Sequence, residues 1–313
     1  MLLNNRSYEF DEFIKAWSSE NKHEFMKAVS IANKVDDVAS LLKKLPKSEV
    51  TIKTIRPSIN SLIVAVVPTI DSNSDRGKKV SNFFSPYPVI FVESSGPHFN
   101  YSHSCNEGIE VALKLNPTWI IISNDDIVPL DPFNDLVNSL SKAKGSLYTA
   151  TDPSRKRRHG GSAFITKVNS FGLLFEIFQI ILRRDFVSLQ TLVSFGMKKN
   201  SYSTGDLDTF FPKLISHFGN HRSIEYKAFA DFCVFKADIL KRFRFDENFW
   251  NNYEDRELSF RLFKEGFELI ILPFKLGSVG DVSFNGSLRR RLQNQINKIY
   301  FSSIMDKNLM AER

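Results

Sequence analysis

Two short acidic segments contain the side chains of this chain that are best suited to chemistry. Asn124, Asp125 and Asp126 directly follow an apolar, β-branched run, and Glu254 and Asp255 stand just before a second apolar pattern. Carboxylates at the end of a buried strand are held by the sheet yet reachable from solvent, which suits them to bind Mg²⁺ or Mn²⁺. Asn and Asp are also favoured in turns and helix caps, so a purely structural role stays open for the first segment.

The second acidic segment is predicted to lie in the first turn of a helix that runs to Gly266. A helix amino terminus stabilises an ionised carboxylate, which is the state that a general base requires. Glu254 and Asp255 are therefore candidates for proton transfer, with simple complementation of the helix dipole as the alternative. Glu257 and Arg261 have i,i+4 spacing, and we expect them to form an ordinary ion pair along this helix.

The elements that position these segments are predicted from hydrophobic periodicity. Residues 62–67, 88–92 and 119–122 are continuous apolar runs, typical of strands that are buried on both faces. A helical pattern over about 106–115 separates the second run from the third. Strands that alternate with helices indicate an α/β fold with a doubly wound, mainly parallel sheet.

Polar residues stand at the ends of all three predicted strands. Pro68 and Thr69 follow the first run, Glu93 follows the second, and the Asn124–Asp126 segment follows the third. Ligands of doubly wound sheets bind beyond the carboxyl ends of the strands. We therefore expect these side chains to meet at one edge of the sheet.

The chain divides into a main domain with a helical segment on each side. Helical spacing of apolar residues predicts an N-terminal extension over residues 1–57, and the main domain spans 58–285 with an insertion at about 166–227. Residues 286–313 predict a basic amphipathic helix. An apolar stripe in the insertion and this last helix either pack on the protein itself or lie on a membrane surface. Further strands are predicted at 229–235 and 268–272.

Composition indicates a globular protein that is soluble or peripheral to a membrane. Of the 313 residues, 42% are hydrophobic, 25% are charged and 29 are Phe, so a sizeable core can form. The net charge of +7 favours an anionic partner, such as a nucleotide diphosphate, a nucleic acid or an acidic membrane face. Apolar runs reach only about a dozen residues, short of the roughly 20 that a membrane span requires. Cys105 and Cys233 are too few for a disulfide framework, so we expect a reducing, cytoplasmic setting.

A basic run, Arg155 to Arg158, precedes two glycines at positions 160 and 161. Such a loop could hold a diphosphate or an anionic acceptor and close over it. The alternative is a solvated basic loop. Nucleic-acid binding would call for aromatic residues between the charges, and the run contains none, so nucleic acid is not an expected partner.

Taken in order, these features resemble the family 2 glycosyltransferases, which have the GT-A fold. Pro68-Thr69 looks like the end of the family's first strand, and Asn106-Glu107-Gly108 is similar to the opening of the helix before its acidic motif. Ser123 to Ile127 resembles the metal and nucleotide motif itself. The most specific likeness is the stretch 245–261, which reads FDENFWNNYEDRELSFR and leads to Gly266. The likeness covers about residues 60–285.

This resemblance implies an inverting enzyme that moves a sugar from a nucleoside-diphosphate sugar to a hydroxyl of a glycan, a lipid-linked acceptor or a protein. Asp126 would ligate Mn²⁺ or Mg²⁺, and Asp255, or with less support Glu254, would be the catalytic base. Apart from the resemblance, the aromatic Trp250 could stack on a sugar ring, and Arg155 and Arg158 could bind the acceptor or the diphosphate. The donor-binding residues that the resemblance implies are Pro68, Thr69, Glu93, Asn106, Asn124 and Asp125.

Two positions depart from the family pattern. Many members have a basic residue where this chain has Cys105. Many also carry a late His as a further metal ligand, but residues 278–282 contain none, and Asp281 is the candidate that could replace it. These departures leave open a degenerate GT-A protein that acts as a carbohydrate-binding or scaffold module. A nucleotidyltransferase is a poorer interpretation, because residues 68–73 form no Gly-rich, Arg-containing loop after the first strand.

Overall fold

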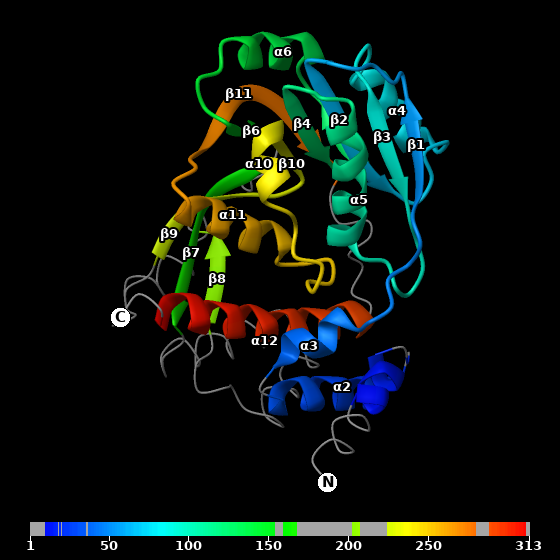
Figure 1. Ribbon diagram of the computed structural model, residues 1–313, viewed down its shortest axis with the longest axis vertical. Helices are drawn as coiled ribbons and strands as arrows, with labels where there is room; N and C mark the ends of the chain where they lie inside the picture. The colour runs from blue at the N-terminus through cyan, green and yellow to red at the C-terminus, as the bar shows by residue number, and fades with distance from the viewer. Residues whose placement is uncertain are drawn as a thin grey trace.

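The computed structural model of this chain describes residues 10–17, 19, 21–35, 37–153, 159–167, 202–206, 224–279 and 288–310. Within them, a large mixed sheet forms the centre of the molecule, with helices on both of its faces (Figure 1). The chain is therefore an α/β protein, as predicted, and its architecture is compatible with a Rossmann-like fold.

The central sheet has eight strands among the described residues, and most of them run in one direction. Strands β3, β2 and β4 are parallel to one another, and so are β6 and β11. Strands β1, β10 and β5 pair antiparallel with their neighbours. The order across the sheet is β1 (Thr51–Ile55), β3 (Val89–Glu93), β2 (Ile63–Thr69), β4 (Trp119–Ser123), β10 (Phe232–Lys236), β6 (Leu147–Thr151), β11 (Leu269–Ser278) and β5 (Ile127–Pro129).

Alternating side chains of the central strands build a core on each face of the sheet. In β2, which is buried throughout, Val64 and Val66 point to one face, whereas Ala65 and Val67 point to the other. The first face is covered by α5 (Tyr101–Lys114), α10 (Ala237–Arg242) and α11 (Glu254–Lys264). The second face is covered by α4 (Asp75–Phe83) and α6 (Phe133–Ser141). Burial on both faces explains why these strands are continuous apolar runs in the sequence.

Helix α5 packs unusually close to β2 and β3 because it carries a glycine at the contact. A Cβ atom at Gly108 would stand 2.3 Å from Cγ1 of Val66 and 2.8 Å from Cγ2 of Val92. The helix begins at Tyr101, earlier than the start near 106 that periodicity predicts. The side chain of Asn100 accepts a hydrogen bond from the backbone N–H of His103 and so caps this earlier start.

Two predicted boundaries differ from the structure. The central sheet already begins with β1 at Thr51, ahead of the predicted boundary at 57, because the alternating Thr-Ile-Lys-Thr-Ile run pairs with the edge of β3. The single strand predicted at 229–235 is divided between β9 (Ile224–Phe229) and β10. The chain leaves one sheet and enters the other at Asp231, whose backbone carbonyl accepts a hydrogen bond from the N–H of Asn124.

A second, smaller sheet lies beside the first and consists of β8 (Tyr202–Asp206), β7 (Gly160–Lys167) and β9 in that order, all antiparallel. Strand β8 belongs to the predicted insertion at 166–227. The apolar stripe predicted in that insertion lies outside the described residues.

The ends of the described chain come together on one side of the molecule. Residues 10–17 are helical, as predicted, and are followed by α2 (Lys22–Lys34) and α3 (Val38–Lys43). The predicted C-terminal helix is α12 (Leu288–Met310), which runs beside α2 and α3 (Figure 1). These helices share one hydrophobic core with the small sheet and with Phe249 and Trp250. The two terminal segments therefore cover the stretch of chain that leads to Glu254.

Candidate active site

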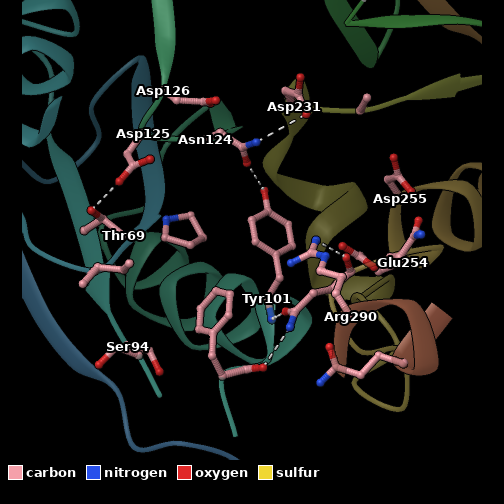
Figure 2. A pocket seen from close by; sticks show the side chains of 18 of the residues that line it. Thr69, Ser94, Tyr101, Asn124, Asp125, Asp126, Asp231, Glu254, Asp255 and Arg290 are labelled. Atoms are coloured by element: carbon pink, nitrogen blue, oxygen red, sulfur yellow. Dashed lines mark hydrogen bonds between the residues drawn. The ribbon is translucent and has the colours of Figure 1, made fainter. Parts of the chain in front are cut away.

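A cavity of about 470 Å³ opens at the carboxyl ends of β2 and β4. Both acidic segments reach it, although they are far apart in the sequence (Figure 2). Thr69 and Asp125 lie on one side of it and Glu254, Asp255 and Arg290 on the other. The described residues that line it are Pro68, Thr69, Ile70, Arg76, Ser94, Ser95, Gly96, Pro97, Phe99, Tyr101, Asn124, Asp125, Asp126, Ala230, Asp231, Asn251, Asn252, Glu254, Asp255, Ser278, Arg290 and Gln293.

The first side of the cavity is formed by the ends of β2 and β4. The hydroxyl of Thr69 donates a hydrogen bond to Oδ2 of Asp125 over 2.6 Å, which fixes this carboxylate at the cavity wall. Thr69 itself is almost fully buried, so its hydroxyl is held in place by the surrounding sheet. Of the residues predicted to bind a donor, Pro68, Thr69, Asn124 and Asp125 are thus brought together here.

Asn124 is held in the middle of the cavity by two side chains from different elements. Its Oδ1 atom accepts a hydrogen bond from the Tyr101 hydroxyl over 3.0 Å, and its Nδ2 atom donates to Oδ1 of Asp231 over 3.3 Å. Burial raises the pKa of Tyr101 well above its ordinary value, so this phenol remains a neutral donor. Asn124 is therefore oriented by its neighbours rather than left to cap a turn.

Asp126 carries the feature in this cavity that most directly indicates a cation. Its Oδ2 atom accepts a hydrogen bond from the Ser278 hydroxyl over 3.3 Å, and its backbone carbonyl accepts one from the N–H of Val279 over 2.9 Å. The other carboxylate oxygen, Oδ1, is buried and has no hydrogen-bond partner among the described residues. A buried carboxylate oxygen without a partner is costly unless a ligand satisfies it.

Glu254 and Asp255 begin helix α11, as predicted. The loop before them adopts the left-handed conformation at Asn251 (φ 58°) and Tyr253 (φ 74°), which turns the chain sharply into the helix. The Glu254 side chain is buried, and one of its oxygens has no hydrogen-bond partner in the described structure. Burial, followed by the nearby charge of Asp255, raises the pKa of Glu254 to about 8, while the charge of Arg290 opposes this shift.

Helix α12 holds this loop through a row of polar side chains. Asn297, which is fully buried, accepts a hydrogen bond from the N–H of Trp250 and donates to the carbonyls of Trp250 and Asn252. Asn294 accepts a bond from the Asn252 side chain, and Arg290 donates to the carbonyl of Asn251. The position of Glu254 and Asp255 therefore depends on a helix outside the region of family resemblance.

Glu93, a predicted donor-binding residue, is not among the described residues that line the cavity. Its carboxylate accepts hydrogen bonds from Lys53, at 2.8 Å, and from the backbone and hydroxyl of Ser72, at 2.9 and 2.6 Å. The bond from Lys53, supported by those from Ser72, lowers the pKa of Glu93 to about 2. Glu93 thus joins β1 to the loop after β2, and its neighbours Ser94 and Ser95 line the cavity instead.

Asn106 and Trp250 also do not line the cavity, and both contact other parts of the chain. The Asn106 amide exchanges hydrogen bonds with the backbone of Phe245 and donates to Oε1 of Glu247, so it anchors the stretch that leads to α11. Trp250 is fully buried and packs edge-on against Trp17 at 5.0 Å between ring centroids, which prevents it from stacking on a sugar. Both differences arise because the terminal helices and α5 enclose this stretch.

The remaining predictions concern the basic run, Asp281, one ion pair and the two cysteines. Arg155, Arg158 and Asp281 lie outside the described residues. The ion pair of Glu257 with Arg261 is confirmed, with 2.5 Å between Oε1 and Nε. Both cysteines are buried and free.

The lining residues that sequence reasoning missed include Arg76, Tyr101, Asp231 and Arg290. Asp231 had a detectable signal, because a carboxylate that interrupts an apolar run marks a break between strands. Arg290 stands in a basic run that resembled a membrane-facing surface, and only the packing of α12 shows where it lies.

Comparison with protein-family models and with curated proteins gives no match for this chain. Among the described residues, no group of three or more His, Cys, Asp or Glu side chains is arranged to hold a metal ion. No helix in the described part of the chain combines the length and the apolar character needed to cross a membrane. The functional assignment therefore rests on the geometry and chemistry of the cavity.

Proposed function

We propose that this chain is an inverting glycosyltransferase of the GT-A type, which moves a sugar from a nucleoside-diphosphate sugar to an acceptor hydroxyl. One observation carries the proposal: both acidic segments that resemble family 2 motifs line a single cavity at the carboxyl ends of parallel strands. Ligands of open α/β sheets bind at this edge. The acceptor is a glycan, a lipid-linked group or a protein hydroxyl, and the chain acts in the cytoplasm or at a membrane surface.

The two sides of the cavity suit the two parts of a donor. Thr69, Asp125 and Ser94 offer hydroxyl and carboxylate groups on one side, which fit the hydroxyls of a ribose and the polar edge of a base. Glu254 and Asp255 lie on the opposite side, where the sugar and the acceptor would meet (Figure 2). Asn124 and Asp126 stand between them, where a diphosphate would lie.

Asp126 fits a divalent cation that is shared with the substrate. Mg²⁺ and related ions are commonly held by one or two carboxylates together with substrate phosphates rather than by a complete protein cage. One carboxylate with a buried oxygen that has no partner among the described residues matches this arrangement. When bound there, Mn²⁺ or Mg²⁺ would neutralise the charge of the departing diphosphate.

The electrostatics of the Glu254-Asp255 pair favour Asp255 as the base. The raised pKa of Glu254, about 8, means that this side chain largely keeps its proton at neutral pH. Asp255 is less buried than Glu254 and is fixed by a hydrogen bond of 2.8 Å from the N–H of Arg256 to its Oδ1 atom. The proton on Glu254 spares the site a second buried negative charge.

The reaction then proceeds as a single displacement. Asp255 accepts the proton of the acceptor hydroxyl as the hydroxyl oxygen attacks the anomeric carbon. The bond between that carbon and the phosphate oxygen breaks, and its electron pair leaves with the nucleoside diphosphate. Because attack and departure occur on opposite faces, the anomeric configuration is inverted.

The direct test is release of nucleoside diphosphate from a panel of UDP-, GDP-, ADP- and dTDP-sugars with Mn²⁺ or Mg²⁺. We expect hydrolysis or transfer with at least one donor, abolished by Asp255→Asn while donor binding stays near normal. Asp238→Asn is the matched control, because Asp238 is an exposed carboxylate paired with Lys241 on α10. No release from any donor with either metal would favour the carbohydrate-binding or scaffold alternative, and turnover by Asp255→Asn would defeat the assignment of the base.

A further inference from the structure

The charges around the cavity pose a difficulty for an anionic donor. Among the described residues that line it, the cationic side chains are Arg76 and Arg290, and the carboxylates are Asp125, Asp126, Asp231, Glu254 and Asp255. A diphosphate that enters such a surrounding is repelled unless fixed positive charges lie where its oxygens come to rest. With Glu254 protonated, a divalent cation at Asp126 would offset the remaining negative excess of the lining, but it leaves the charge of the diphosphate itself to the two arginines.

The two arginines differ in how well they can meet this need. Arg76 lies in the first turn of α4, and its side chain is exposed to solvent. Arg290 is half-buried, and its Nη2 atom donates a hydrogen bond of 2.7 Å to the backbone carbonyl of Asn251. A guanidinium that is tied to the backbone and partly removed from water loses less entropy and is less screened when it binds an anion.

Arg290 also lies on the side of the cavity where the reaction would occur. Figure 2 shows it beside Glu254, across the cavity from Thr69 and Asp125. The charge of Arg290 opposes the rise in the pKa of Glu254 that burial causes. The planar fork of an Arg side chain matches two phosphate oxygens at once, which the ammonium of a Lys cannot do.

We propose that Arg290 of α12 is a binding residue for the diphosphate of the donor, so that the C-terminal helix supplies part of the active site. The proposal rests on the proposed function and extends it, because it assigns the positive charge that stabilises the leaving diphosphate to a residue outside the region of family resemblance. Arg290 thus has two tasks, which are to bind the diphosphate and to hold the loop at Asn251.

These two tasks can be separated by comparing ligands that differ only in phosphate. A diphosphate contact affects nucleoside diphosphates and inorganic pyrophosphate but leaves nucleoside monophosphates largely unaffected. A purely structural role through Asn251 would instead weaken every ligand of the cavity together and lower the thermal unfolding midpoint.

The experiment is calorimetric titration of UDP, GDP, ADP and dTDP, their monophosphates and pyrophosphate, each with Mn²⁺, into the full-length wild type and three variants. Arg290→Gln should bind the preferred diphosphate and pyrophosphate about tenfold more weakly, or worse, because a charge-assisted hydrogen bond is lost. Arg290→Lys should show an intermediate loss. Arg242→Gln, which removes an equal charge from the exposed surface of α10, should bind like the wild type.

Equal affinity of the wild type and Arg290→Gln for the diphosphates and for pyrophosphate would overturn the proposal while leaving the proposed function intact. A parallel loss for monophosphates and diphosphates would also overturn it, because it would assign Arg290 a structural role alone. No binding of any nucleoside diphosphate or of pyrophosphate to the wild type would overturn the proposed function itself, together with this extension.

Discussion

Replacing Asn297 by alanine should loosen the loop that presents Glu254 and Asp255. Asn297 is fully buried in α12 and forms three hydrogen bonds to this loop, two with the backbone of Trp250 and one with the carbonyl of Asn252. The loop contains two residues in the left-handed conformation, Asn251 and Tyr253, each of which stores strain that its surroundings must offset.

The size of the effect follows from which groups lose their partners. The N–H and carbonyl of Trp250 belong to a residue with no solvent exposure, so each would be left unsatisfied at about 1–3 kcal/mol. The Asn252 carbonyl is only partly buried and adds less. We therefore expect Asn297→Ala to lower the free energy of unfolding by about 3–5 kcal/mol.

The assay is urea unfolding followed by circular dichroism, with Asn294→Ala as the matched control. Asn294 lies one turn earlier on the same helix and accepts a single bond, from the Asn252 side chain, in a more exposed place. Its replacement should cost about 1 kcal/mol. Equal losses of about 1 kcal/mol for both variants would refute the view that α12 holds the loop through Asn297.

Three further predictions concern the cavity and its supports. Glu254→Gln should stabilise the protein increasingly as the pH rises from about 4.5 to about 8, by a few kcal/mol at the upper end. The wild type loses stability over this range, because the pKa of Glu254 is raised in the folded protein. An equal difference in the free energy of unfolding between variant and wild type at pH 5 and at pH 8.5 would contradict this prediction. Asp126→Asn should abolish the additional thermal shift that Mn²⁺ gives in the presence of a nucleoside diphosphate, so an undiminished shift would remove Asp126 from the metal site. Gly108→Ala should destabilise by about 1–3 kcal/mol in urea unfolding, because the added Cβ would overlap Val66; a neutral result would show that α5 can move away from the sheet.

Much of the central sheet could be predicted because its signals are local. Strands β2, β3 and β4 are buried on both faces, and burial on both faces requires continuous apolar runs that are visible in the sequence. Helix α11 could be predicted equally well, since its apolar spacing, its acidic first turn and the Glu257–Arg261 pair all lie within one segment. Polar residues at strand ends likewise pointed to the edge where Thr69 and Asp125 meet.

The roles of particular side chains depended on contacts between distant segments. Asn106 looked like a donor-binding residue because it precedes Gly108 in a familiar pattern, yet its amide is engaged by Phe245 and Glu247. Trp250 looked like a sugar-stacking surface, yet the terminal helices enclose it completely. Local pattern reveals that a residue is polar or aromatic, but not which other segment comes to cover it.

The sequence by itself determined the α/β class, the strands at the centre of the sheet and the two acidic segments. Only the tertiary structure decided that these segments share a cavity, that Asp231 joins them and that α12 brings Arg290 and Asn297 to the loop before Glu254. The physical reason is the range of the interactions. Burial periodicity and helix dipoles act within a few residues, whereas the partners of a buried amide or carboxylate are set by how whole elements pack.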